Sequence, residues 1–324
     1  MTTAKVTSAP FATGSLPNAV TVHEVGPREG LQSNARVLDT ATKHRFVEEL
    51  ARTGLRRIEV TGFFHPVRVP QLADAADLIG ALGKDFSKSR GVRLAAHIPN
   101  RVGLGRALDA GVDEVIICLS ASDETARREA DDCASTADCQ RKVESLLEQS
   151  RDAGVWTRVF LTNTWGCPYI GEIEPQRVHS LVGALVAAGA DEICLADTLA
   201  AATPAHVRRV LDLVRQDTAA EKLALHFHDN RGMALVNALT GLGYGIATID
   251  AAAAGLGGHG MCEYVPTNPV MLATEELLFA LDGLGVETGV DIEAVRQAGT
   301  SMANSLGVPV PGRYAKAGPV ERIP

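Results

Sequence analysis

The chain alternates short apolar runs with longer amphipathic stretches, and this alternation constrains its fold more than any other feature. From residue 19 onward there are about eight pairs, each an apolar run followed by a stretch of helical periodicity. Repeated strand and helix pairs are typical of parallel sheets, and eight pairs close a barrel. Most runs are continuously apolar, as strands covered on both faces must be. The expected strands are Ala19 to Val25, Leu55 to Gly62, Arg93 to Ile98, Glu114 to Ser120, Trp156 to Thr162, Glu192 to Asp197, Lys222 to His228 and Ile246 to Ala252.

A weak internal repeat marks where the helices between these strands should end. The pattern Asp109-Ala-Gly-Val-Asp-Glu-Val115 recurs as Ala187-Ala-Gly-Ala-Asp-Glu-Ile193, and its glycine recurs at Gly54, Gly154 and Gly245. Glycine tolerates the left-handed conformation that ends a helix before the next strand begins. Helix starts agree, because Pro175 and Pro204 sit where a first helical residue should.

We therefore predict one domain, a single (β/α)8 TIM barrel with a C-terminal helical extension. The alternative of two doubly wound domains needs a linker, and no Pro/Gly/Ser-rich boundary falls between residues 19 and 289. We expect a flexible N-terminal arm over residues 1–18, the barrel with an extra C-terminal helix over 19–306, and a proline-containing tail over 307–324. Helices are expected from Met271 to Leu284 and from Ile292 to Leu306.

Composition narrows the classes of partner. With 324 residues, 46% of them hydrophobic, the chain can bury a large core, and its net charge of -8 without a basic stripe argues against nucleic acid. No apolar run approaches the roughly 18 to 20 residues of a membrane span, and the first 18 residues lack a targeting pattern, so we expect a cytoplasmic protein. The six cysteines contain no Cys-x-x-Cys pair, and Cys118 and Cys194 fall in runs that should be buried strands, which favours a reduced compartment.

The seventh expected strand ends in two histidines, His226 and His228. Residues two apart on a strand project from one face, so both imidazoles should point one way and Phe227 the other. Core histidines bonded to the backbone are the structural alternative, which a lone histidine would favour. Two imidazoles on one face at a strand end, followed by Asp229, indicate a metal site instead.

Groups at other strand ends can complete this site, because barrel chemistry sits at the C-terminal ends of the strands. Glu29 follows the first strand, and Asn268 lies beyond the eighth. A salt bridge is the alternative for Glu29, and a turn before Pro269 is the alternative for Asn268. Mixed nitrogen and oxygen ligands favour Mg²⁺ or Mn²⁺, with Zn²⁺ less expected because no thiolate is needed.

A cation also lies near the expected barrel mouth. Arg28 would be uncompensated there, and Glu59 is the natural partner to hold its guanidinium in a bidentate pair, from which it can stabilise an enolate oxygen. Of the lysines, only Lys222 touches an expected strand, at the wrong end, so a Schiff-base mechanism has no nucleophile. Carbon-carbon chemistry would therefore have to run through the metal.

Further polar residues follow other strands. His97 lies in the third expected strand, and Asp197 and Thr198 end the sixth. Beyond the eighth comes Gly255-Leu-Gly-Gly-His259 with Cys262 nearby. A tight turn is one explanation of these glycines, and a mobile loop that carries a reactive group is the one we favour.

Several of these motifs occur together in one known family. They are Glu24-Val-Gly-Pro-Arg-Glu-Gly-Leu-Gln32, Arg57-Ile-Glu59, Gly166-Cys-Pro-Tyr169, Ala196-Asp-Thr198, His226-Phe-His-Asp229 and Ala254-Gly-Leu-Gly-Gly258. From about Val20 to Leu306 the chain resembles hydroxymethylglutaryl-CoA lyase and its metal-dependent barrel superfamily. That superfamily also contains the Claisen-condensing enzymes that make isopropylmalate, homocitrate and citramalate.

The resemblance implies a reaction, a dimer and roles for residues. In the lyases a retro-Claisen cleavage splits a tertiary 3-hydroxyacyl-CoA into acetyl-CoA and a keto acid. The metal holds the hydroxyl and carboxylate while a base removes the hydroxyl proton. Carried over by position, the metal ligands are Glu29, His226, His228 and Asn268, the enolate-stabilising cation is Arg28 with Glu59 and Asp197 supporting it, and the substrate-binding residues are Gln32 and Thr198.

The chain departs from the lyase pattern twice. Lyases have Asp where this chain has Glu29, although homocitrate synthases have Glu, so metal binding survives. Lyases also follow Gly-Leu-Gly-Gly with a catalytic Cys, and ungapped counting from Asn268 gives that position to His259. We expect His259 to carry the proton, with Cys262 as the alternative carrier.

We expect a lyase that acts on a 3-hydroxy-3-methylglutaryl-CoA-like acyl-CoA. The alternative enzyme is an acyltransferase that joins acetyl-CoA to a 2-oxo acid by Claisen condensation. A non-catalytic barrel that keeps the metal for stability is the alternative of another class. The strand-end acids Glu59 and Asp197 argue against it.

Overall fold

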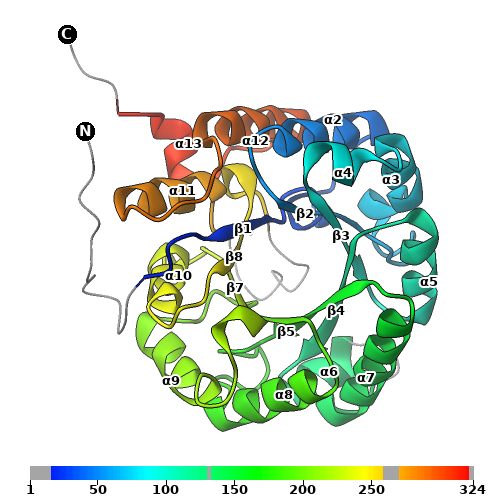
Figure 1. Cartoon of the computed structure of the whole chain (residues 1–324), viewed down its shortest axis with the longest axis vertical. Helices are drawn as coiled ribbons and strands as arrows, with labels where there is room; N and C mark the ends of the chain where they lie inside the picture. The colour runs from blue at the N-terminus through cyan, green and yellow to red at the C-terminus, as the bar shows by residue number, and fades with distance from the viewer. Residues whose placement is uncertain (1–15, 130–132, 258–269, 321–324) are drawn as a thin grey trace.

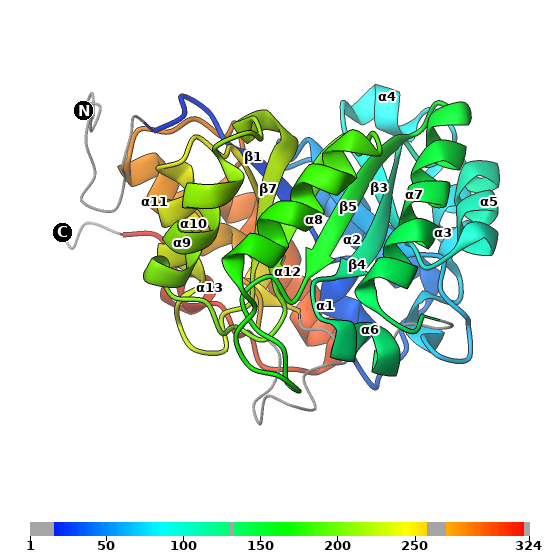
Figure 2. The same ribbon diagram turned by 90° about the horizontal axis from the view of Figure 1, so that it is seen from below.

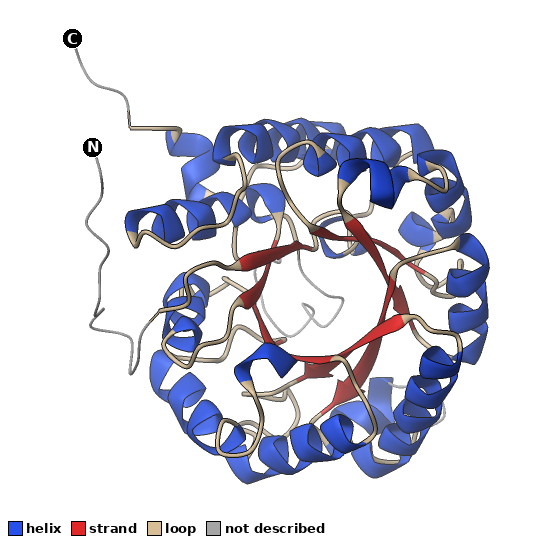
Figure 3. Cartoon of the chain, viewed as in Figure 1, coloured by secondary structure: helices blue, strands red, loops and turns tan. Residues whose placement is uncertain are grey.

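The computed structural model describes residues 16–129, 133–257 and 270–320. Eight parallel strands close into a barrel in chain order, with β8 paired back onto β1 (Figures 1 and 3). The predicted barrel is therefore confirmed. The strands are β1 Thr21–Glu24, β2 Arg57–Gly62, β3 Arg93–Ile98, β4 Glu114–Ser120, β5 Trp156–Thr162, β6 Glu192–Asp197, β7 Leu223–Phe227 and β8 Thr248–Ala251.

Helices surround the barrel on the outside, as Figure 2 shows from the side. Pro175 and Pro204 occupy first positions of α8 and α9, and Gly111 follows α5 in the left-handed conformation with φ 80°, as predicted. The helices are α1 Glu29–Gln32, α2 Thr40–Ala51, α3 Ala75–Leu82, α4 Phe86–Arg90, α5 Arg101–Ala110, α6 Asp123–Glu129, α7 Thr136–Asp152, α8 Pro175–Ala187, α9 Pro204–Val214, α10 Ala234–Leu242, α11 Thr274–Gly283, α12 Ile292–Leu306 and α13 Arg313–Ala317. Short 3-10 turns lie at η1 Pro70–Leu72, η2 Ala220–Lys222 and η3 Ala253–Gly255.

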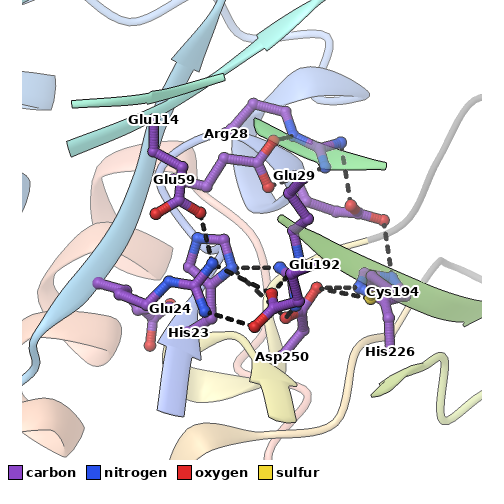
Figure 4. Close-up of polar contacts among 12 residues, drawn as sticks. His23, Glu24, Arg28, Glu29, Glu59, Glu114, Glu192, Cys194, His226 and Asp250 are labelled. Carbon is purple, nitrogen blue, oxygen red and sulfur yellow. Dashed lines mark hydrogen bonds and ion pairs between the residues drawn. The ribbon is translucent and has the colours of Figure 1, made fainter. Parts of the chain in front are cut away.

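The main hydrophobic core lies between the strands and the surrounding helices. The inside of the barrel holds a smaller cluster from β3 to β7, which includes Ala95, Ile116 and Phe160. Small side chains leave room inside for a buried ionic network, in which Arg158 Nε lies 2.7 Å from Glu192 Oε2 and Arg158 Nη2 lies 2.8 Å from Asp250 Oδ1. Asp250 of this network also contacts His226, so the network lies next to the end of β7 inside the barrel (Figure 4).

The structure contains a disulfide that the sequence did not predict, and it corrects the expected burial of Cys118. Cys133 and Cys139 form a disulfide, because the start of α7 brings their Cα atoms to 5.4 Å, a separation that a sequence spacing does not reveal. Cys118 lies in a strand as expected, but its side chain is exposed, because this position of β4 faces a cavity at the barrel mouth. Cys194 is buried, as predicted.

Element ends differ from the prediction by a few residues. Helix α12 has the predicted bounds, whereas α11 begins at Thr274 rather than Met271, because Met271 forms a bridge with His228. The last residues of the expected arm are held in place, since Glu287 N donates to Asn18 O at 3.0 Å.

In the part of the chain that is described, no helix has the length and apolarity to span a membrane.

Candidate active site

His226 and His228 lie at the end of β7 with their Nε2 atoms 3.3 Å apart. Glu29 begins α1 just after β1, and its Oε1 is 2.9 Å from His228 Nε2 and 3.6 Å from His226 Nε2. All three side chains are buried, and their ligand atoms lie within 4.8 Å of one another. Phe227 points to the other side of the strand and stacks on Trp165. The structure thus brings together the two imidazoles and the carboxylate that the sequence singled out.

Each imidazole is fixed through its other nitrogen. His226 Nδ1 is 3.1 Å from Asp250 Oδ2, and His228 Nδ1 is 2.9 Å from the carbonyl oxygen of Thr198. These partners turn both Nε2 atoms toward Glu29, and such outer contacts typically orient metal-binding histidines. The sequence analysis missed Asp250, although its place near the end of the eighth strand could have indicated it.

The donor set fits a divalent cation. Burial raises the pKa of Glu29, but the Arg28 guanidinium and the imidazoles of His226 and His228 lower it more, so the pKa lies well below its usual range. Burial lowers the pKa of His226, whereas the carboxylates of Glu29 and Asp250 raise it, to about 9. The anionic carboxylate and two converging imidazole nitrogens offer oxygen and nitrogen ligands that bind metal once the imidazoles are neutral.

Arg28 and Glu59 form the predicted bidentate pair (Figure 4). Arg28 Nε and Nη2 donate to Glu59 at 2.7 and 2.9 Å, and Nη1 lies 2.9 Å from Glu29 Oε2. Burial raises the pKa of Glu59, but Arg28 and His97 lower it further, to about 2. The guanidinium is therefore held rigidly beside the candidate metal ligands. Gln32 accepts a longer hydrogen bond from Arg28 Nη1 at 3.3 Å.

Asp197 and Thr198 hold loops around this site. The carboxylate of Asp197 accepts hydrogen bonds from the amides of Ala201 and Ala202 at 2.8 and 2.9 Å, and burial raises its pKa. The carboxylate therefore binds the loop that follows β6. Its contacts do not include Arg28, which the sequence analysis expected it to support. The Thr198 hydroxyl accepts from the amide of Asn163 at 3.0 Å, and Thr198 also lines the cavity.

A cavity that opens to solvent connects these groups at the C-terminal ends of the strands. Its far wall contains two residues to which the sequence gave no role, His97 on β3 and Cys118 on β4. His97 Nε2 is 3.1 Å from Cys118 Sγ. The cavity is lined by Arg28, Glu29, His97, Cys118, Phe160, Thr162, Thr198, His226 and His228.

Three predicted site residues, His259, Cys262 and Asn268, lie outside the described residues. The described residues that precede and follow them lie beside the site. Leu256 and Val270 form an antiparallel bridge, and Asp229 N donates to Val270 O at 2.7 Å.

A closed barrel with two strand-end histidines, a carboxylate and a bidentate arginine at its mouth defines a metal-dependent barrel enzyme. Comparison with known proteins narrows this class. A family model described as HMGL-like matches residues 19–302, and the chain belongs to this family of carbon-carbon lyases.

The similarity covers nearly the whole chain. Hydroxymethylglutaryl-CoA lyase of Bacillus subtilis is 37% identical over 92% of this chain and 96% of the relative. A 3-hydroxy-3-isohexenylglutaryl-CoA/hydroxymethylglutaryl-CoA lyase of Pseudomonas aeruginosa is 36% identical over 94% of this chain and 98% of the relative. The structure of a lyase from Acinetobacter baumannii with coenzyme A and 3-methylmalate matches with TM-score 0.85 and 30% identity, over 98% of this chain and 100% of that one.

Proposed function

We propose that the protein cleaves 3-hydroxy-3-methylglutaryl-CoA, or an acyl-CoA close to it, into acetyl-CoA and a keto acid. The observation that carries the proposal is the convergence of Glu29, His226 and His228 beside the Arg28–Glu59 pair. Retro-Claisen cleavage needs a group that holds the hydroxyl and carboxylate of the substrate and a cation that stabilises the developing enolate. Both lie in one cavity here.

The metal ligands in this proposal are Glu29, His226, His228 and Asn268. Mg²⁺ or Mn²⁺ suits these oxygen and nitrogen donors better than Zn²⁺. When bound, the metal would orient the substrate and lower the pKa of its hydroxyl. Arg28 keeps its charge and its planar fork toward the thioester oxygen, because Glu59 fixes its Nε and Nη2.

We place the residue that takes the hydroxyl proton in the segment between Leu256 and Val270. We assign a proton carrier to His259, with Cys262 as the alternative, and both lie outside the described residues. The same segment begins against Glu29, because a Cβ added at Gly257 would lie 3.7 Å from Glu29 Cγ. Substrate contacts remain assigned to Gln32 and Thr198, the first beside Arg28 and the second in the cavity wall.

The acyl group is a narrower question than the reaction. The relative at 37% identity is named for hydroxymethylglutaryl-CoA alone, whereas the relative at 36% identity is named for isohexenylglutaryl-CoA as well, so identity at this level does not determine the substituent. We expect a homodimer in the cytoplasm that binds small molecules and no nucleic acid.

The test is an assay of the metal-loaded protein with a panel of hydroxyacyl-CoAs and of 2-oxo acids with acetyl-CoA. We expect release of acetyl-CoA from the glutaryl-type substrates. Consumption of acetyl-CoA with a 2-oxo acid would instead establish the Claisen-condensing alternative. Metal-dependent melting without turnover of any acyl-CoA would establish the non-catalytic barrel.

A further inference from the structure

Three titratable side chains on neighbouring strands are aligned beside the cavity. They are Glu59 on β2, His97 on β3 and Cys118 on β4. His97 Nε2 lies 3.1 Å from Cys118 Sγ, and His97 Nδ1 lies 3.4 Å from Glu59 Oε1. A sulfur, an imidazole and a carboxylate in this order form the arrangement of an activated thiol, in which the carboxylate orients the base.

Cys118 is the exposed member of this group, although His97 also lines the cavity. His97 and Glu59 are 5% and 1% exposed, whereas Cys118 is exposed and lines the cavity with Arg28, Phe160 and Thr162. The neighbours of Cys118 along β4, Ile117 and Leu119, are buried. Cys118 is therefore the exposed position within a buried stretch of β4, and its thiol can contact a substrate in the cavity.

The imidazole is held in a charged setting. Burial lowers the pKa of His97, but the Cys118 sulfur and the Glu59 carboxylate raise it, and the pKa reaches about 9. Arg28, which faces the same carboxylate, lowers it. His97 can therefore carry a proton at neutral pH and hold it against the sulfur.

Glu59 also fixes the distance between this group and the enolate-stabilising cation. Its Oε1 accepts from Arg28 Nε at 2.7 Å and lies 3.4 Å from His97 Nδ1. One carboxylate thus holds the cation for the enolate oxygen and the imidazole behind Cys118. The thiol and the guanidinium then face the same end of the substrate.

We propose that Cys118 is a catalytic residue that protonates the enolate carbon, with His97 as its positioning residue. The inference rests on the proposed cleavage. There the hydroxyl O–H bond breaks and its proton goes to a base, a role that His259 can fill. A carbonyl forms as the C2–C3 bond breaks, and the C2–C3 electron pair enters the thioester enolate. The enolate carbon then takes the proton of Cys118, and the S–H electron pair stays on sulfur. The proton held by His97 restores the thiol, and the proton that left the hydroxyl returns to His97 through water.

The reverse of this step gives a direct measurement. Metal-loaded wild-type protein with acetyl-CoA in D₂O should incorporate deuterium at the thioester methyl group. Cys118→Ala and Cys118→Ser should lose this exchange, and kcat for cleavage should fall by roughly 10²-fold or more with little change in KM. The matched control is Cys167→Ser. Cys167 is buried, does not line the cavity and accepts a hydrogen bond from the Ser122 hydroxyl. Metal content and melting temperature show whether each variant is folded.

The rate at which Cys118 is alkylated measures the role of His97, because a residue that only packs against the thiol would not change that rate. In a Cys262→Ser background, iodoacetamide should alkylate Cys118, acetyl-CoA should protect it, and His97→Gln should slow the alkylation. If Cys118→Ala keeps wild-type exchange and kcat in a protein that cleaves its substrate, this inference is wrong while the proposed function stands. If the wild type neither cleaves an acyl-CoA nor exchanges the protons of acetyl-CoA, both proposals fall.

Discussion

At the scale of the residue, the site depends on Arg28 being held between two carboxylates. Lys in its place would keep the charge but lose the planar fork that Glu59 fixes through two hydrogen bonds. We expect Arg28→Lys to fold and to lose roughly 10²-fold or more in kcat, as expected for a donor that acts in the transition state. Steady-state kinetics check this, with Arg209→Lys, a half-exposed partner of Glu172, as the control. A raised KM with unchanged kcat would show that Arg28 only binds substrate.

The sequence predicted part of the site at this scale. Spacing placed His226 and His228 on one face, because strand periodicity fixes the side to which residues two apart point. The pair of His97 and Cys118 could not be predicted in this way. It depends on the register between β3 and β4, which sets His97 opposite Ile116 and therefore places Cys118 two residues further along β4. A one-residue shift changes the face of every later side chain.

At the scale of the element, the segment between Leu256 and Val270 carries the two residues to which we assign the proton of the substrate hydroxyl, His259 and its alternative Cys262. Both ends are tied to the site, since Leu256 bridges Val270 and Met271 bridges His228. A free imidazole has a pKa of about 6.5 and a free thiol one of about 8.5. His259 can therefore donate or accept a proton at neutral pH without a shift in its pKa.

We therefore expect His259→Ala to lose several orders of magnitude in kcat while Cys262→Ser keeps most activity. Kinetics on both variants measure this ranking. The opposite ranking, together with iodoacetamide inactivation that persists in Cys118→Ser and is prevented by substrate, would assign the proton to Cys262.

Strands and helices themselves were predictable because their signals are local. The periodicity predicted all eight strands, four of them with the observed bounds, among them β3 and β6. The other four, β1, β2, β7 and β8, were predicted too long, because ladder pairing, which the sequence does not show, decides where a strand begins and ends. The disulfide of Cys133 and Cys139 likewise depends on the turn into α7.

At the scale of the whole molecule, a buried carboxylate reinforces the closure that β1 and β8 make through their backbone pairing. Glu24 on β1 accepts from the amides of Gly26 and Ala253 at 2.9 Å and from the Thr274 hydroxyl at 2.7 Å, which ties the first strand to the segments after the last. Burial raises the pKa of Glu24 to about 7 against these hydrogen bonds. Glu275, which accepts from the amide of Ala254, also has a pKa raised by burial to about 7.

A raised carboxyl pKa gives stability that is complete below the unfolded pKa and is lost as pH rises through the folded pKa. The free energy of unfolding should therefore fall as pH rises from 4.5 to about 7, with on the order of 1 to 3 kcal/mol from Glu24. Glu24→Gln stays neutral, so its loss over this window should be smaller. Denaturant melts of the chelator-treated protein at each pH measure the difference. Equal slopes in wild type and variant would contradict the assignment.

The central claim is that two histidines and a carboxylate at the barrel mouth hold the metal on which cleavage depends. Elemental analysis of His228→Ala tests it most directly, because His228 Nε2 lies 2.9 Å from Glu29 Oε1 and 3.3 Å from His226 Nε2. His179→Ala is the control, since His179 contacts Asp217 on the surface. We predict that His228→Ala loses bound Mg²⁺ or Mn²⁺ and most turnover while the control keeps both. Full metal occupancy in His228→Ala would contradict the account.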